Sequence, residues 1–326
     1  MRYHAELIDR IEAHQLEVLG DLSEAARAEL RATIDESLES YLEDVTDRAF
    51  RSVWHEIATY ERAMDMAAGE SPDDYARSLA GARGRLMDAC ASVLEMDPAC
   101  MDALPVQAIA SAESPLDRLR RLEAIVSEQH VMERVSEAAK EHDGVASADP
   151  LVRGHLRAYA ALARTYYQCT FYDIAWVRCS ELIEADADDI AGARYTKALC
   201  AARLEDEEML NYLDASFQRS SNAWIDLARA LILYKLNRMP AATRALRTFC
   251  TRCDGAAFAL LSPTYVDTYL PCRPDFETGS YDEAVLAVHE ADQVVVDAPG
   301  FIPWASSVEG IEDMAIDFAR RYGMDW

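Results

Sequence analysis

The stretch Leu156–Asp189, which reads LRAYAALARTYYQCTFYDIAWVRCSELIEADADD, decides the fold. Its apolar side chains recur every three or four positions in two successive segments, which is typical of two amphipathic helices. The small residues Ala163 and Ala175 stand where two antiparallel helices must approach closely, and the large side chains of Tyr166 and Tyr172 stand opposite them. We therefore predict a helical hairpin. Because neither helix can bury its apolar stripe alone, the hairpin needs neighbours on which to stack.

The spacing within this stretch matches the tetratricopeptide repeat, a helical hairpin with a period of about 34 residues. Leu162, Ala163 and Tyr166 fall where the first helix of that repeat carries its L-G-x-x-Y group. Advancing the frame by one period and then by another gives two further units, whose matching residues are Thr196, Cys200, Met209, Leu213, Ala230 and Tyr234. We predict an all-α solenoid of tetratricopeptide-like hairpins.

Breaks in the helical pattern divide the chain further. The main boundary is the run His142-Asp143-Gly144, and Ser280 opens a capping box, S-Y-D-E, that predicts a helix to about Val294. We expect four segments: an N-terminal helical region (1–70), degenerate hairpins (71–141), an array of about three units (142–255), and a proline-containing loop with C-terminal capping helices (256–326).

Composition restricts the class of partner. The formal charge of −26 and the pI near 4.6 argue against nucleic acid, because phosphate binding requires a basic surface. The same charge disfavours an anionic membrane surface. No apolar run approaches the roughly 18 residues of a membrane span. The acidic N-terminal segment is no signal peptide, and the eight cysteines lack the spacing of a secreted disulfide scaffold. We expect a cytoplasmic protein that binds neither nucleic acid nor membrane.

Two further stretches carry a resemblance to a known family. The run ELIEADADDIAGARYTKAL (181–199) and the tail YLPCRPDFETGSYDEAVLAVHEADQVVVDAPGFIPW (269–304) resemble bacterial tetratricopeptide-like proteins related to the suppressor of tumorigenicity seven family. The segment CTRCDGAAFALL (250–261) departs from that family's pattern. The resemblance implies a repeat scaffold and implies no catalytic activity for this chain.

Motifs that mark enzymes are missing from the sequence. It contains no Walker loop, no G-x-G-x-x-G after a strand, no H-E-x-x-H and no G-x-S-x-G, so we expect no enzyme and no cofactor. Cys250, Cys253 and Cys272 supply three of the four ligands that a zinc site needs. A single C-x-x-C without a second pair favours reduced thiols instead.

The most informative candidates are the positions that line the concave face in this type of repeat. They are Arg157, Arg164, Tyr167, Gln168, Arg194, Ile232 and Lys235. Four cations on one face of an acidic protein suit an acidic peptide or a C-terminal carboxylate, because arginine binds carboxylates bidentately. In the alternative interpretation, Arg157, Arg164 and Arg194 pair with acids of the same chain.

We therefore predict a non-catalytic, cytoplasmic protein-interaction scaffold that binds a partner peptide or protein on its concave face. Two alternatives stay open. One is a zinc-binding protein that uses the three cysteines. The other is a structural subunit that forms a homo-oligomer through the N-terminal helices (1–70).

Overall fold

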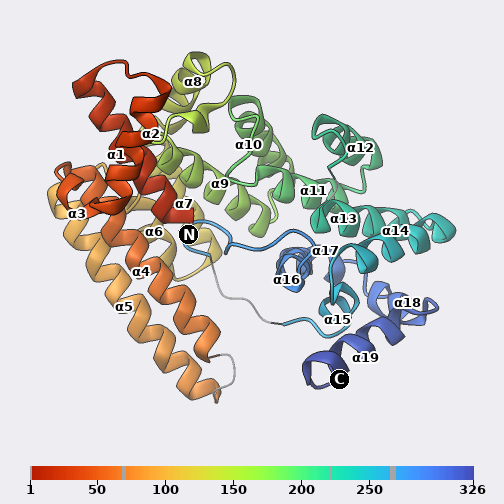
Figure 1. Cartoon of the computed structure of the whole chain (residues 1–326). Helices are drawn as coiled ribbons and strands as arrows, with labels where there is room; N and C mark the ends of the chain where they lie inside the picture. Colours follow the sequence, from red (N-terminus) through yellow and green to blue (C-terminus); the bar gives the residue numbers. More distant parts are fainter. Residues whose placement is uncertain (1, 68–70, 221, 265–268) are drawn as a thin grey trace. The chain divides into compact units, whose positions relative to one another are not determined.

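The computed structural model of the chain describes residues 2–67, 71–220, 222–264 and 269–326 (Figure 1). These residues form nineteen α-helices and one 3-10 helix and contain no strand, so the all-α prediction is confirmed. Within the same ranges, no helix combines the length and the apolar composition that a membrane crossing requires. The predicted boundary at residue 70 and residues 265–268 of the predicted proline loop lie outside the described residues.

The chain divides into two compact units, each assembled from segments that are not continuous in sequence. The first unit comprises residues 1–162, 184–191 and 269–274. Its helices are α1 (Arg2–Leu19), α2 (Glu24–Glu36), α3 (Leu38–Tyr41), α4 (Val45–Ala67), α5 (Pro72–Met96), α6 (Leu104–Ala110), α7 (Pro115–Glu128), α8 (Val131–Glu141), η1 (Ala146–Ala148) and the first part of α9 (Arg153–Gln168).

The core of the first unit forms where α1 and α5 pack against α4. Helices α4 and α5, of 23 and 25 residues, lie side by side as a long hairpin (Figure 1). Ile11 of α1 and the α4 residues Phe50, Val53 and Ile57 are fully buried there. The three apolar positions of α4 recur every three or four residues, so they lie on one helical face and bury together.

The second unit comprises residues 163–183, 192–268 and 275–326. Besides the end of α9, its helices are α10 (Tyr172–Ala185, whose last two residues belong to the first unit), α11 (Ala193–Leu204), α12 (Glu207–Ser216), α13 (Ala223–Lys235), α14 (Met239–Arg252), α15 (Ala256–Leu261), α16 (Tyr281–Glu290), α17 (Asp292–Val296), α18 (Phe301–Ser307) and α19 (Ile311–Tyr322).

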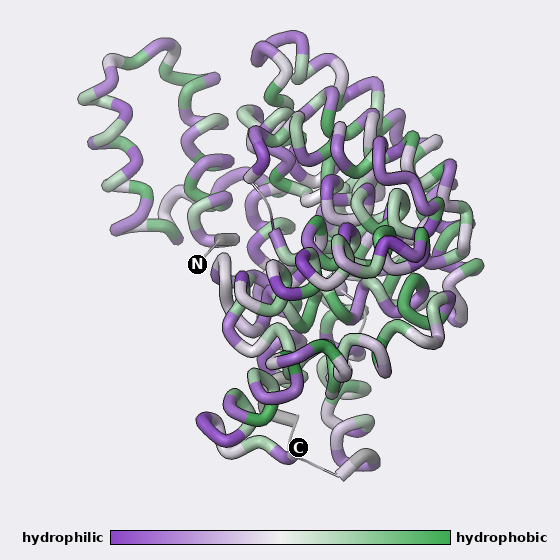
Figure 2. Tube along the Cα trace, turned by 90° about the vertical axis from the view of Figure 1, so that its right-hand side faces the viewer, coloured by the Kyte–Doolittle hydropathy of each residue, from purple (hydrophilic) through white to green (hydrophobic). Residues whose placement is uncertain are grey.

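Helix α13 is the centre of the second unit. It packs against α11, α12, α14 and α16, and its residues Trp224, Leu227 and Leu231 are fully buried. Figure 2 shows hydrophobic and hydrophilic stretches alternating along single helices, as expected for helices that bury one face. Helix α13 instead has apolar side chains around most of its circumference, because neighbours cover it on several sides.

The predicted capping box at the start of α16 is confirmed in one half. Ser280 Oγ accepts a hydrogen bond from the backbone N–H of Glu283 at 3.2 Å. A full capping box also requires the carboxylate of Glu283 to accept a hydrogen bond from the backbone N–H of Ser280, and this bond is not formed. It accepts instead from the backbone N–H groups of Gly279, at 2.7 Å, and of Ala223 at the start of α13, at 2.9 Å. Glu283 therefore joins α16 to the central helix.

Candidate functional site

The predicted binding face in the second unit is formed by α11, α13 and residues 163–168 of α9, and the chain's own α16 and α17 lie against it (Figure 1). The hydroxyl of Tyr167 donates to the backbone oxygen of Glu290 at 3.1 Å. Gln293 Nε2 donates to the backbone oxygen of Gln168 at 2.8 Å. Trp224 Nε1 donates to the carboxylate of Glu290 at 2.7 Å. This face is therefore occupied by the C-terminal segment.

Three of the predicted groove residues, Arg164, Tyr167 and Ile232, lie in the interior of the second unit and are not part of an exposed groove surface. Ile232 is 0% exposed, and both Tyr167 and Arg164 are buried. Burial raises the pKa of Tyr167 well above its usual value, so its hydroxyl stays protonated and acts as a hydrogen-bond donor. The guanidinium of Arg194 lies 5.0 Å from the ring centre of Phe217, within reach of a cation–π interaction.

Lys235, the remaining predicted cation of this face, is held in an ion-pair cluster. Its Nζ lies 3.0 Å from Glu205 and 2.8 Å from Asp297, and Arg203 contacts the same oxygen of Asp297 at 2.7 Å. The hydrogen bond from Lys235 lowers the pKa of Asp297 below its usual range. The cluster ties the end of α17 to α11 and α13 and leaves Lys235 committed within the chain.

Arg157 belongs to the first unit and is buried in a network of ion pairs. Its Nη1 donates to both carboxylate oxygens of Glu6, at 2.7 and 2.8 Å, and its Nη2 donates to Asp102 at 2.7 Å. Burial opposes the charged form of Asp102, but Arg10 and Arg157 outweigh it and hold the pKa of Asp102 below its usual range. For Arg157, the alternative interpretation, pairing with the chain's own acids, is confirmed.

The same network extends to His14, Asp44 and Asp47. In the described part of the chain these residues form the one group of three potential metal ligands whose ligand atoms lie within 4.8 Å of one another. His14 Nδ1 lies 2.8 Å from Asp47 Oδ2, and the other oxygen of Asp47 faces Arg10 at 3.5 Å. Asp44 Oδ1 accepts from the backbone and the hydroxyl of Thr46, both at 2.6 Å. These contacts describe a helix cap beside a His–Asp pair, and each ligand is already engaged within the chain.

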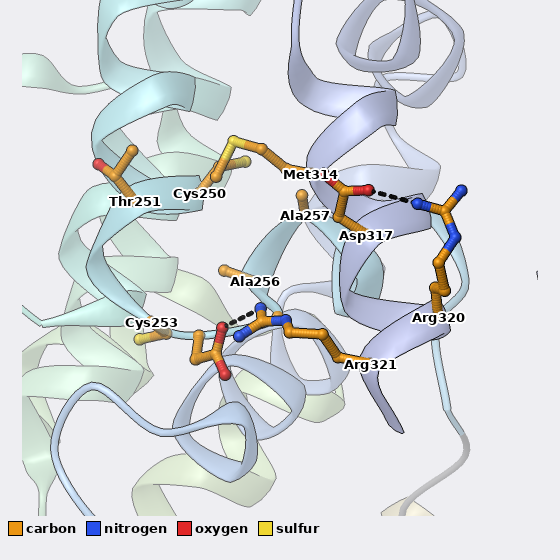
Figure 3. Close-up of a pocket in the computed structure, with 11 residues that line it drawn as sticks. Cys250, Thr251, Cys253, Ala256, Ala257, Met314, Asp317, Arg320 and Arg321 are labelled. Atoms are coloured by element: carbon orange, nitrogen blue, oxygen red, sulfur yellow. Dashed lines mark hydrogen bonds and ion pairs between the residues drawn. The ribbon is translucent and has the colours of Figure 1, made fainter. Parts of the chain in front are cut away.

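The three cysteines of the zinc alternative are divided between the two units. Cys250 and Cys253 line a cavity of about 720 Å³ between the end of α14, α15 and α19 (Figure 3), whereas Cys272 belongs to the first unit. Burial raises the pKa of both Cys250 and Cys253 to about 12, so both thiols stay protonated at neutral pH. Cys253 donates weakly to Glu283 at 3.6 Å.

The rim of this cavity is closed by an ion pair. Arg321 of α19 donates to the carboxylate of Asp254 at 2.7 Å, and Tyr322 donates to the second oxygen at 3.3 Å (Figure 3 shows the first contact). Met314 and Ala257 give the wall an apolar character. The cavity thus combines protonated thiols, apolar surface and a neutralised charge pair, and it offers no activated nucleophile.

Sequence reasoning missed a second cavity, of about 680 Å³, between α12, α13 and α14. Its lining is mostly polar and consists of Asn211, Asp214, Arg219, Asp226, Arg229, Ala245, Thr248 and Arg252. None of these residues falls on the face that the repeat pattern assigns to binding, and no motif marks them.

Comparison with known proteins adds no relative: no protein-family model, no curated protein and no solved structure matches the chain.

Proposed function

We propose that the protein is a non-catalytic protein-interaction scaffold built of stacked tetratricopeptide-like hairpins. The succession of helix pairs supports this architecture: α11 packs against α12, α13 packs against α14, and α11 also contacts α13. Contact between the first helices of successive pairs is what stacking of hairpins in a solenoid requires. That the chain belongs to the suppressor of tumorigenicity seven family stays a prediction, and it rests on the residues that carry the resemblance.

A partner that docks in an open concave groove no longer fits this proposal, because α16 and α17 fill that face. Displacing them would expose buried side chains such as Ala284, Leu286 and Val294 and would break the hydrogen bonds of Glu283 and Glu290. Partner binding then falls to the outer surface of the hairpins.

The observation that carries the proposal is an apolar stripe on α10. Phe171, the residue before α10, and Ile174 and Val177 within it are 45%, 41% and 50% exposed, and their spacing of three residues places them on one side of this segment. The exposed acids Asp173 and Glu184 flank this stripe. The arrangement suits a partner helix that presents apolar side chains bordered by lysine or arginine, the helix-in-groove mode of recognition with complementary charge.

Quantitative affinity purification from the native cell tests this function. The double variant Ile174→Gln, Val177→Gln removes apolar area but keeps residues that favour a helix. The matched control, Leu116→Gln, changes a residue of α7 that is 46% exposed. We expect a partner that the wild type and the control retain, that the double variant loses, and that added salt weakens. Identical sets of captured proteins from all three baits would contradict the proposal.

A specific observation also favours the oligomeric alternative. Val18 and Leu19, at the end of α1, are 82% and 54% exposed and adjacent in sequence. If the N-terminal helices form a homo-oligomer, light scattering on the purified chain gives a multiple of 36.4 kDa, and the variant Val18→Gln, Leu19→Gln returns it to that mass. A wild-type mass of 36.4 kDa rejects this alternative.

A further inference from the structure

The cavity between α12, α13 and α14 has an excess of hydrogen-bond donors. Two carboxylates face three guanidinium groups, and each carboxylate already accepts from one of them. Arg229 donates to Asp214 Oδ2 at 2.8 Å and also to Asn211 Oδ1 at 2.5 Å. Arg252 donates through its Nε to Asp226. Both acids are thereby engaged by arginines that themselves line the cavity.

The side-chain groups of the cavity wall that are not paired within the chain are mainly cationic. The side chain of Arg219 forms no hydrogen bond or ion pair with any described residue. Arg252 uses only its Nε, so its two terminal nitrogens lack partners among the described residues. A guanidinium that faces a cavity with uncommitted N–H groups is suited to an anionic ligand.

The cavity also contains an acceptor without a donor. Asp214 Oδ1 is buried and accepts no hydrogen bond, although Asp214 Oδ2 is paired with Arg229. A buried acceptor that is left unpaired costs free energy, which a ligand that carries an N–H or O–H group would recover. The wall therefore presents two complementary requirements, a negative group for Arg219 and Arg252 and a donor for Asp214.

The balance of charge selects among anions. Three guanidinium groups and two carboxylates leave one net positive charge, which matches a single carboxylate. A phosphate dianion would exceed that charge and would be repelled by Asp214, and a metal cation would be repelled by the arginines. We propose that this cavity is a binding site for a small monocarboxylate that carries a hydrogen-bond donor beside its carboxyl group, as an amino acid, a hydroxy acid or the end of a peptide does.

This site lies on α12, α13 and α14 and is separate from the α10 stripe, so the two proposals succeed or fail independently. Ligand-observed saturation-transfer NMR on the whole purified chain measures binding directly. The probes are L-alanine, L-lactate and N-acetyl-L-alanine, which distinguish a free amino acid, a hydroxy acid and a peptide end. Propionate lacks the donor, and L-alaninamide lacks the carboxylate.

We expect saturable binding of at least one of the three probes below about 20 mM, with propionate roughly tenfold weaker and L-alaninamide weaker still. Arg219→Gln should weaken the binding roughly tenfold, since its side chain is exposed and holds no other residue in place. The matched control Arg244→Gln changes an exposed arginine of α14 outside the cavity and should leave binding unchanged. Asp214→Asn should reduce the ratio between the affinity for the best probe and the affinity for propionate.

Three results would overturn the site. The first is no saturable binding of any of the three probes. The second is equal binding of propionate and the donor-bearing acids. The third is an Arg219→Gln variant that binds as the wild type does. Circular dichroism of each variant separates a lost site from a lost fold.

Discussion

Replacing Glu283 by alanine removes the contact that joins the C-terminal segment to the central helix. The carboxylate of Glu283 is 1% exposed and accepts the backbone N–H groups of Ala223 and Gly279, at 2.9 and 2.7 Å. Cys253 adds a weak third donor at 3.6 Å. In the alanine variant these donors lose their acceptor and face an apolar methyl group; the contact of Ala223 is buried and that of Gly279 is half-buried.

The magnitude follows from the number of donors left without an acceptor. Each buried N–H that loses its partner costs about 1–3 kcal/mol, so two of them cost about 4 kcal/mol in the free energy of unfolding. Glu283→Gln keeps one carbonyl oxygen and therefore one acceptor, and we expect it to lose about half as much. Asp282→Ala is the matched control: its carboxylate is exposed in the first turn of α16, where it contributes about 0.3–1 kcal/mol.

Two measurements check this prediction. Urea unfolding gives the loss of stability for the three variants, and we expect the order Glu283→Ala, then Glu283→Gln, then Asp282→Ala. Hydrogen–deuterium exchange should localise the effect to peptides that cover the start of α13 and residue 279. If Glu283→Ala costs as little as Asp282→Ala, or if exchange at the start of α13 does not change, the carboxylate does not hold these two segments together and the reasoning fails.

Three further perturbations follow from contacts described above or from backbone geometry. Gly255→Ala should lower the stability by about 2–4 kcal/mol in calorimetry, since residue 255 has φ +73° and an added Cβ would lie 2.5 Å from the Phe318 ring. The hydrogen bond with Asp47 raises the pKa of His14, although burial opposes it, so this pair stabilises the fold fully below about pH 6.5 and less as the pH rises through the raised value. The difference in urea stability between wild type and His14→Gln should therefore be larger near pH 5.5 than near pH 9. Arg157→Met leaves the buried carboxylate of Glu6 without its cation and Asp102 with Arg10 alone, and it should cost about 3–5 kcal/mol in urea unfolding.

Matched variants give these predictions their controls. Gly310→Ala shares the positive φ, +86°, but meets open space, so it should cost only about 1 kcal/mol. Equal losses for Gly255→Ala and Gly310→Ala would show that the ring contact has no effect. For His14, a stability difference that is constant with pH would contradict the charged pair. For Arg157, a loss below about 1 kcal/mol would show that Glu6 and Asp102 are not dependent on it.

Local features of the fold were predictable from the sequence because they depend on neighbouring residues. Ser280 caps α16 because its hydroxyl lies three residues before an amide that needs an acceptor, and that offset is readable in any sequence. The helical class and the helices around Tyr166 and Leu213 follow from the recurrence of apolar residues every three or four positions. These patterns act over one or two helical turns.

The candidate site was not predictable for the opposite reason. Nothing near Ile232 or Tyr167 in the sequence indicates that α16 and α17, which begin at Tyr281, cover them. The partners of Arg157 lie 55 and 151 positions away, so the sequence left open whether that guanidinium was free or paired. Arg219 is a further case, since its place in a cavity depends on three helices and on a loop whose backbone has a positive φ. Long-range pairing is set by the packing of whole elements.

The hydrogen bond between Ala223 and Glu283 also has a consequence for synthesis on the ribosome. The amide of Ala223 is made 60 residues before the carboxylate that accepts its proton. Late in that interval α11 and α13 have been translated, but the segment that will cover them has not. Their apolar side chains are then exposed to chaperones and to other nascent chains, and the second unit reaches its native packing only after α16 and α17 have emerged.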